Sequence, residues 1–193
     1  SDVYKRQEGE AAGYGVIGSA GDCRGISLSW NDKTALLLTG GLLTEDQLKD
    51  SVLALLAAGM SLYVLDYKAL LHFDERLREY EKQIEDVGIL AYLLNPLQSA
   101  YDYDDIARDY LDITLPSHQD VFAKNSHETV YGQNPDMFFK FLGWNCAVPR
   151  MSRGPLRDAL SQAKMDTLYD QIELPLAYVL RSMEDYGIKT QRD

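Results

Sequence analysis

Hydrophobic and polar positions alternate through the first 40 residues of the chain. Between residues 23 and 30, Ile26, Leu28 and Trp30 fall on one face and small polar residues on the other. This is the period of a half-buried strand. Asn31 and Asp32 follow as a two-residue hairpin signal. With the glycine-rich apolar segment before them, these patterns predict an antiparallel meander of three strands, at residues 11–20, 23–30 and 33–38.

After this meander the pattern changes to helices that alternate with strands. Thr44 and Gln47 make a capping box, which opens a helix that Gly59 ends. The apolar segment at residues 60–65 predicts a buried strand, and Asp66 begins the next helix as its N-cap. The other elements of this region are expected to be a helix at 67–73, a charged helical stretch at 74–82 and a short strand at 84–87.

Two further helices are predicted from residue 89 onward. The apolar run at residues 89–94 ends at Asn95 and Pro96, because proline disfavours the helical conformation in the residue before it. A second helix opens over residues 101–105, where carboxylates suit the positive end of a helix dipole. Its apolar side is formed by Ile106, Tyr110 and Leu111.

The C-terminal third has a less regular pattern. An apolar cluster at residues 137–144 predicts a helix or loop that covers the core, with a lipid- or partner-docking surface as the alternative. A break rich in proline and glycine is expected at residues 148–154. From Leu156 we predict a long helix that Pro175 interrupts and Gly187 ends. Its apolar stripe consists of Ile172, Leu176, Val179, Leu180 and Met183.

This order of elements predicts an α/β domain. Three antiparallel strands come first, then helix, strand, helix and strand, and then helices alone, which builds a mixed central sheet flanked by helices. With 193 residues the chain can form one sizeable domain, or one domain and a piece of another. Residues 1–7 fit no element and carry no apolar secretory segment, so we expect a non-native or disordered leader.

Composition narrows the classes of function. The formal net charge is −11, whereas a free-standing nucleic acid-binding domain is normally basic, because much of its affinity comes from neutralising phosphates. No apolar run reaches the roughly 20 residues of a membrane span. Cys23 and Cys146 lack motif spacing and are expected to be reduced, and the histidines lack zinc-ligand spacing. A cytoplasmic location is expected.

Two segments resemble a known family. Residues 86–96, DVGILAYLLNP, and residues 101–111, YDYDDIARDYL, resemble the 3′–5′ exonuclease region of the family A DNA polymerases, the bacterial DNA polymerase I family. Residues 173–180, ELPLAYVL, with Met183-Glu184 and Gly187-Ile188 behind them, are similar to the segment that joins the exonuclease region of this family to its polymerase region. The exonuclease-like stretch at residues 86–111 and the joining segment that begins at residue 173 occur in the right order, and together they are more specific than either alone.

The resemblance covers the chain from about Gly25 onward and implies a ribonuclease H-like 3′–5′ exonuclease fold. It places an exonuclease-like domain at residues 8–165 and the start of the polymerase domain at residues 166–193, so polymerisation is not expected of this chain itself. Proofreading members hold two divalent metal ions with several carboxylates. These are an Asp-x-Glu pair on the first strand, an aspartate after the fourth strand and a Tyr-x-x-x-Asp motif on a late helix.

Only one of these four carboxylates has a counterpart in the sequence. Asp66 matches the aspartate after the fourth strand, whereas residues 11–21 contain no carboxylate and no tyrosine precedes Asp158 or Asp166 by four positions. We interpret Asp66 as a vestigial catalytic residue that serves as an N-cap. No catalytic residue, cofactor site or metal site is expected, and the resemblance assigns no metal role to Asp86.

The sequence therefore indicates a degenerate exonuclease-like domain without its own enzymatic activity. The resemblance implies that it supports the DNA-directed DNA polymerase, a nucleotidyltransferase, of the same parent chain in bacterial DNA replication and repair. Magnesium and DNA would be bound by that polymerase domain, and a monomer is expected. Two alternatives stay open: an active exonuclease with Glu10, Asp66 and Asp102 as displaced ligands, and a non-enzymatic protein-interaction module that uses residues 137–144.

Overall fold

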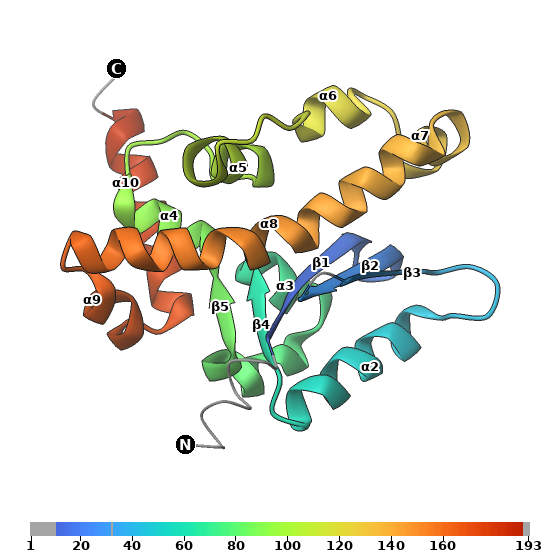
Figure 1. The fold of residues 1–193 in the computed structure, drawn as a ribbon, viewed down its shortest axis with the longest axis horizontal. Helices are drawn as coiled ribbons and strands as arrows, with labels where there is room; N and C mark the ends of the chain where they lie inside the picture. The colour runs from blue at the N-terminus through green and yellow to red at the C-terminus, as the bar shows by residue number, and fades with distance from the viewer. Residues whose placement is uncertain (1–10, 32, 191–193) are drawn as a thin grey trace.

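A five-stranded sheet lies at the centre of the computed structural model, which describes residues 11–31 and 33–190 (Figure 1). The strands are β1 Ala11–Ser19, β2 Asp22–Trp30, β3 Lys33–Leu38, β4 Ser61–Val64 and β5 Ile84–Asp86. Their order in the sheet is β3-β2-β1-β4-β5. β1, β2 and β3 form the predicted antiparallel meander. β4 pairs in parallel with β1, and β5 pairs in parallel with β4. The predicted α/β class with a mixed central sheet is confirmed.

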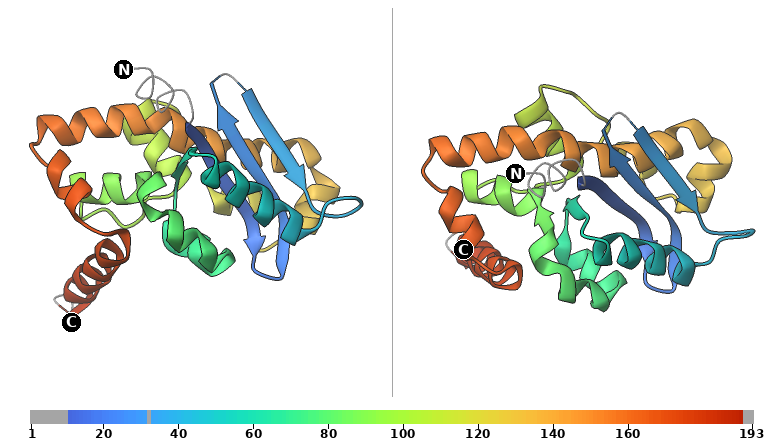
Figure 2. Two further views of the ribbon diagram at one scale, coloured as in Figure 1. Left: turned by 90° about the horizontal axis from the view of Figure 1, so that it is seen from below. Right: turned by 60° about the horizontal axis from the view of Figure 1, so that its bottom comes forward.

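Helices cover both faces of this sheet. They are α2 Glu45–Ala57, α3 Tyr67–Phe73, the 3₁₀ segment η1 Glu75–Gln83, α4 Val87–Leu94, α5 Tyr103–Leu111, α6 His118–Phe122, α7 His127–Gln133, α8 Pro135–Gln162, α9 Asp166–Gln171 and α10 Leu174–Thr190. α8 crosses one face and contacts the first four strands. Figure 2 shows α2 on the opposite face. The small polar side of β2 is therefore buried, with Ser27 and Ser29 almost fully covered beneath α8.

Several helix and turn signals of the first half have the expected geometry. Thr44 caps α2 and forms the predicted capping box with Gln47, whose side chain accepts from the Thr44 N–H at 3.0 Å. α4 ends before Asn95, as the Asn-Pro pair predicts. Asn31 has the positive φ, 50°, that a two-residue hairpin requires. Asp32 and residues 1–10 lie outside the described residues.

The break predicted at residues 148–154 is wrong, because α8 runs through it without interruption. Both Pro149 and Pro155 lie inside this 28-residue helix. An internal proline removes a hydrogen bond and costs a helix about 3 kcal/mol. Packing outweighs this cost: residues on one side of the segment are buried between the sheet and the helices beyond it, namely Cys146, Val148, Pro149, Ser152 and Leu156.

The long helix predicted from Leu156 is also wrong, because three separate helices occupy this region. α8 ends at Gln162, α9 is short, and α10 begins at Leu174. Pro175 therefore lies in the first turn of α10, where its missing N–H has no helical acceptor and its fixed φ suits the helix. Gly187 does not end α10, which continues to Thr190, since a single internal glycine costs only about 1 kcal/mol.

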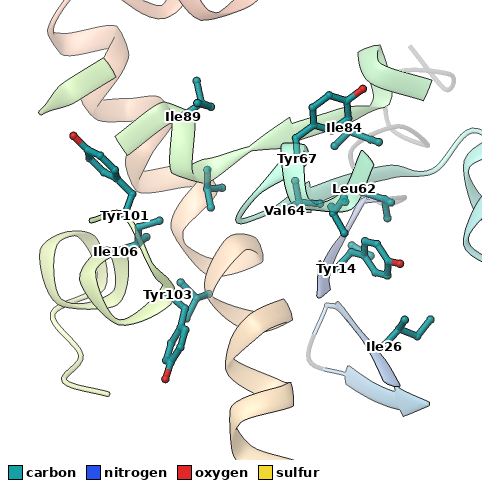
Figure 3. Close-up of a cluster of buried hydrophobic side chains, with 14 of the residues drawn as sticks. Tyr14, Ile26, Leu62, Val64, Tyr67, Ile84, Ile89, Tyr101, Tyr103 and Ile106 are labelled. Carbon is teal, nitrogen blue, oxygen red and sulfur yellow. The ribbon is translucent and has the colours of Figure 1, made fainter. Parts of the chain in front are cut away.

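The hydrophobic core is one cluster, and buried residues of α8 form part of it. Figure 3 shows side chains of the sheet and α3 on one side of α8, and Ile89, Tyr101, Tyr103 and Ile106 on the other. The cluster at residues 137–144 belongs to this core: Phe138, Phe141 and Leu142 are buried, and Phe139 is 36% exposed. The predicted core-covering helix is confirmed, and the exposed docking surface expected of an interaction module is not found there.

Two remaining predictions concern the cysteines and membranes. Cys23 and Cys146 are buried and carry free thiols. Burial raises the pKa of both thiols, so they are poor nucleophiles. Among the described residues, no helix has both the length and the apolar character needed to cross a membrane.

Candidate functional site at the carboxyl ends of the parallel strands

β1, β4 and β5 run parallel, so their carboxyl ends meet at one edge of the sheet. In α/β sheets this edge is where ligands usually bind. The chain places two aspartates there. Asp86 is the last residue of β5 and pairs in register with Val64 of β4, and Asp66 follows two residues behind Val64. The edge is therefore the candidate site, and Asp66 is the residue that the sequence nominated.

Asp66 has the N-cap role predicted for it. Its Oδ1 accepts a hydrogen bond of 3.0 Å from the N–H of Ala69, in the first turn of α3. The residue is exposed, and the Tyr178 hydroxyl lies 3.2 Å from the same oxygen. Asp66 is also the single carboxylate among the described residues that line the adjacent cleft, a largely apolar space of about 340 Å³.

On β1, close packing against α8 leaves no room for side chains at Gly13 and Gly15. A Cβ atom on Gly13 would lie 1.8 Å from the carbonyl oxygen of Cys146, and one on Gly15 would lie 2.8 Å from the Cβ of Asn145. The two glycines thus let the strand and helix backbones touch. A carboxylate at Gly15 has no room without displacement of α8.

The residues of α8 that face β1 also lack carboxylates. Asn145, Cys146 and Arg150 contact the two glycines, and the Arg150 Nε donates to the Ser29 hydroxyl at 2.8 Å. An arginine therefore lies beside the glycines of β1 on this face of α8. Asp158, one of the two aspartates considered for the late motif, is exposed on α8.

One acidic group in the described part of the chain is close enough to share an ion, and it lies at the start of α5. It consists of Asp102, Asp104 and Asp105. Asp102 is the N-cap of α5, and the Asp105 carboxylate accepts from the Asp102 N–H at 3.0 Å. Burial, followed by the neighbouring carboxylates, raises the pKa of Asp102. The position of these carboxylates at a helix start agrees with the prediction from the sequence, and the N-cap role of Asp102 is an addition from the structure.

The displaced ligand set of the alternative exonuclease hypothesis is not brought together by the described residues. Asp66 is not a member of the acidic group that contains Asp102. Glu10, the third proposed ligand, lies outside the described residues, as does Glu8. Two divalent ions need several oxygen ligands around a shared site. The described residues at this edge of the sheet do not fit such a pair of ions.

Asp86 is the residue that sequence reasoning passed over. It is fully buried and accepts hydrogen bonds from the backbone N–H groups of Tyr67, at 2.8 Å, and Ile89, at 3.0 Å. The Tyr178 hydroxyl donates to it as well. Burial raises the pKa of Asp86 to about 7, against the opposing effect of these donors. An aspartate immediately before a fully apolar helix was the signal that could have marked it.

Contacts of α9 and α10 converge on the same end of β5. The Tyr169 hydroxyl accepts from the Asp86 N–H at 2.9 Å. The guanidinium of Arg157 lies 4.8 Å from the centre of the Tyr169 ring and pairs with both Glu85 and Asp170. Tyr169 and Asp170, whose spacing does not match the late family motif, therefore fasten α9 to β5. The buried aspartate organises a structural joint.

Comparison with known proteins agrees with the resemblance read from the sequence. The chain is 29% identical over 108 residues to DNA polymerase I of Bacillus subtilis (strain 168), and 31% identical over 104 residues to DNA polymerase I of Geobacillus stearothermophilus. These matches span 56% and 54% of the chain but 12% of each relative, so the chain corresponds to a small part of their length. No family model matches.

A solved structure extends the likeness to the fold of nearly the whole chain. It is described as the POL domain of Pol1 from M. smegmatis in complex with DNA primer-template and dNTP. The superposition covers 94% of this chain and 30% of that one, with a TM-score of 0.60 and 20% sequence identity. From the sequence matches, which this likeness of fold accompanies, we conclude that the chain is homologous to bacterial DNA polymerase I.

Proposed function

We propose that residues 8–165 are a ribonuclease H-like 3′–5′ exonuclease domain that has lost its catalytic site, and that residues 166–193 begin the polymerase region. The mixed sheet with its antiparallel meander and parallel additions supports this assignment, together with the two sequence segments described above. The pieces on either side of the assigned boundary pack together, since Tyr169, Leu174 and Ala177 join the core of the domain. A tight junction of this kind suits a supporting domain.

The observation that carries the proposal is the composition of the cleft at the carboxyl edge of the sheet. Its one described carboxylate, Asp66, is exposed and caps α3, and α8 packs against glycines of β1, the strand on which the family carries its carboxylate pair. Hydrolysis through two metal ions requires those carboxylates to position the ions and the attacking water. With one of four present, neither ion has a ligand set.

The role that follows is structural. The domain spaces and supports the polymerase region of the same parent chain, which in the curated relatives is part of a DNA polymerase I. In this proposal DNA and magnesium are bound by the parent polymerase in DNA replication and repair, and not by the described residues. The net charge of −11 agrees with a domain that does not itself hold a polyanion.

A nuclease assay on the purified chain tests the missing activity. The substrate is a 3′-labelled single-stranded oligonucleotide with magnesium or manganese, and the proposal expects no metal-dependent shortening. Asp66→Asn is the informative variant, because asparagine keeps an N-cap but removes the charge that a metal needs. Digestion that Asp66→Asn abolishes would overturn the proposal, whereas digestion that this variant leaves unchanged identifies a contaminating nuclease.

Calorimetric titration with manganese addresses the alternative of displaced ligands. Two-site binding at micromolar concentration that Asp66→Asn weakens would support an active exonuclease. Heat that persists in Asp66→Asn and disappears in Asp104→Asn would instead belong to the acidic start of α5. The proposed function expects no saturable heat that depends on Asp66.

A further inference from the structure

α10 rests on the body of the protein by its first turns and then projects outward. Leu174 and Ala177 are buried, whereas Leu176, Val179 and Met183 are 51%, 54% and 66% exposed. The left view of Figure 2 shows the helix leaving the rest of the ribbon. Most of the apolar stripe predicted for this region therefore faces outward. Little hydrophobic burial holds α10 in place beyond its first turns.

Polar contacts hold those first turns. The N–H of Leu174 donates to Glu81 at 2.8 Å, and the Arg181 guanidinium lies 4.8 Å from the centre of the Tyr101 ring. Glu81 is partly exposed, so water competes for the first contact. The contact of Tyr178 differs from both, because its hydroxyl enters a buried site and donates to the fully buried carboxyl of Asp86.

We propose that Tyr178 is a latch that fixes the orientation of α10, with the buried carboxyl of Asp86 as its receptor. When the hydroxyl leaves, Asp86 keeps the backbone N–H groups of Tyr67 and Ile89. The sheet, α3 and α4 therefore retain their own hydrogen bonds while α10 undocks. α10 then has two states. In the docked state the Tyr178 hydroxyl lies in the buried site, and in the undocked state α10 has left a body that remains folded.

The latch goes beyond the proposed function and is testable without it. A missing nuclease site and a released α10 are measured separately, so either idea can fail alone. One consequence does rest on the proposed function: if α10 leads into the polymerase region of the parent chain, the latch sets the angle between the two regions. Tyr178 then acts as a positioning residue.

Distance measurement between two spin labels tests the latch directly. Met183→Cys on α10 and Leu97→Cys on the body provide exposed label sites, at 66% and 79% exposure. The two native thiols are buried and react poorly. The labelled parent should give one narrow distance distribution. Tyr178→Phe should shift the equilibrium toward undocked α10 by about 10- to 100-fold, the effect of a lost hydrogen bond to a charged or buried group.

A matched control is Ser182→Ala, which removes another hydroxyl from α10. The Ser182 hydroxyl donates to the backbone oxygen of Tyr178 within the helix and is exposed, so its loss should leave the distribution narrow. An unchanged distribution in Tyr178→Phe would overturn the latch, and so would equal broadening in both variants.

A measurement on the unsubstituted chain decides the case in which Tyr178→Phe fails to fold. Native-state hydrogen exchange should show the amides of residues 178–183, which follow the first turn of α10, opening together at lower free energy than the amides of β1 and β4. Equal opening free energies for these segments would mean that α10 opens only when the whole domain unfolds, and the latch would then be rejected.

Discussion

The junctions that follow β4 and β5 share one local design and differ in their surroundings. In each, an aspartate at or just after the end of a parallel strand caps the next helix. The Asp66 carboxylate accepts from the N–H of Ala69 and the Asp86 carboxylate from the N–H of Ile89, both at 3.0 Å. Both aspartates stand three residues before their donor, which is the usual N-cap arrangement.

Coverage makes the difference between the two junctions. Asp66 is exposed, whereas Asp86 is sealed by α3, α9 and α10 and binds a second helix N-terminus through Tyr67. Asp66, the aspartate that the sequence resemblance nominates, therefore has fewer contacts, whereas Asp86 joins β5 to three helices. Whether a residue keeps a motif position and whether it stabilises the fold are separate questions. Burial and hydrogen bonding answer the second.

The largest effect is expected from Asp86→Ala. It leaves the N–H groups of Tyr67 and Ile89 buried without an acceptor and removes the partner of Tyr178. Each unsatisfied buried group costs about 1–3 kcal/mol, so the free energy of unfolding should fall by about 3–5 kcal/mol. Urea denaturation followed by circular dichroism measures this. A loss below about 1 kcal/mol would show that the joint has little effect on stability.

The pH dependence of stability should also separate the two junctions. Burial raises the pKa of Asp86 to about 7 in the folded chain, while an unfolded aspartate titrates near 4. Between these values the folded state binds a proton that the unfolded state does not, so this group makes stability fall as pH rises through this window. The loss is at most about 4 kcal/mol, at roughly 1.4 kcal/mol per pH unit.

Urea midpoints from pH 4 to 8 measure this loss, and Asp86→Asn is the control. Asparagine cannot ionise, so the variant should lack the decline with pH that Asp86 adds to the parent. Identical pH profiles of parent and variant would mean that the folded and unfolded states bind the Asp86 proton equally.

A smaller effect is expected where the two junctions touch. A Cβ atom on Gly88, in the first turn of α4, would lie 2.5 Å from the carbonyl oxygen of Leu65, next to Asp66. Gly88→Ala should therefore push the junctions apart and cost about 1–3 kcal/mol, the usual range for overpacking. Gly132→Ala in α7 meets nothing within 4 Å and should instead stabilise by up to about 1 kcal/mol. Thermal unfolding of the pair gives the comparison.

The smallest effect is expected at Asp66. Asp66→Ala should cost about 1 kcal/mol, because one N-cap bond is lost, whereas Asp66→Asn should change stability by only a few tenths. Denaturant midpoints at neutral pH provide the measurement. A loss in Asp66→Ala as large as that in Asp86→Ala would erase the distinction between the junctions.

Much of the fold could be predicted because its signals are local. The meander, the capping box at Thr44 and the Asp66 cap depend on residues within a few positions of one another. The absence of carboxylates from residues 11–21 was likewise visible in the sequence. Helix α8 escaped prediction as one continuous helix, because its burial in the core outweighs the local cost of Pro149 and Pro155.

By itself, the sequence determined the class of fold and the antiparallel meander at its start. Each follows from residue type and short-range spacing. The burial of Asp86 was decided by tertiary structure alone, since Tyr169 and Tyr178 reach it across 83 and 92 positions of the chain. Hydrogen bonding and dielectric environment at one carboxyl depend on which distant segments cover it, and short-range sequence patterns carry no measure of that.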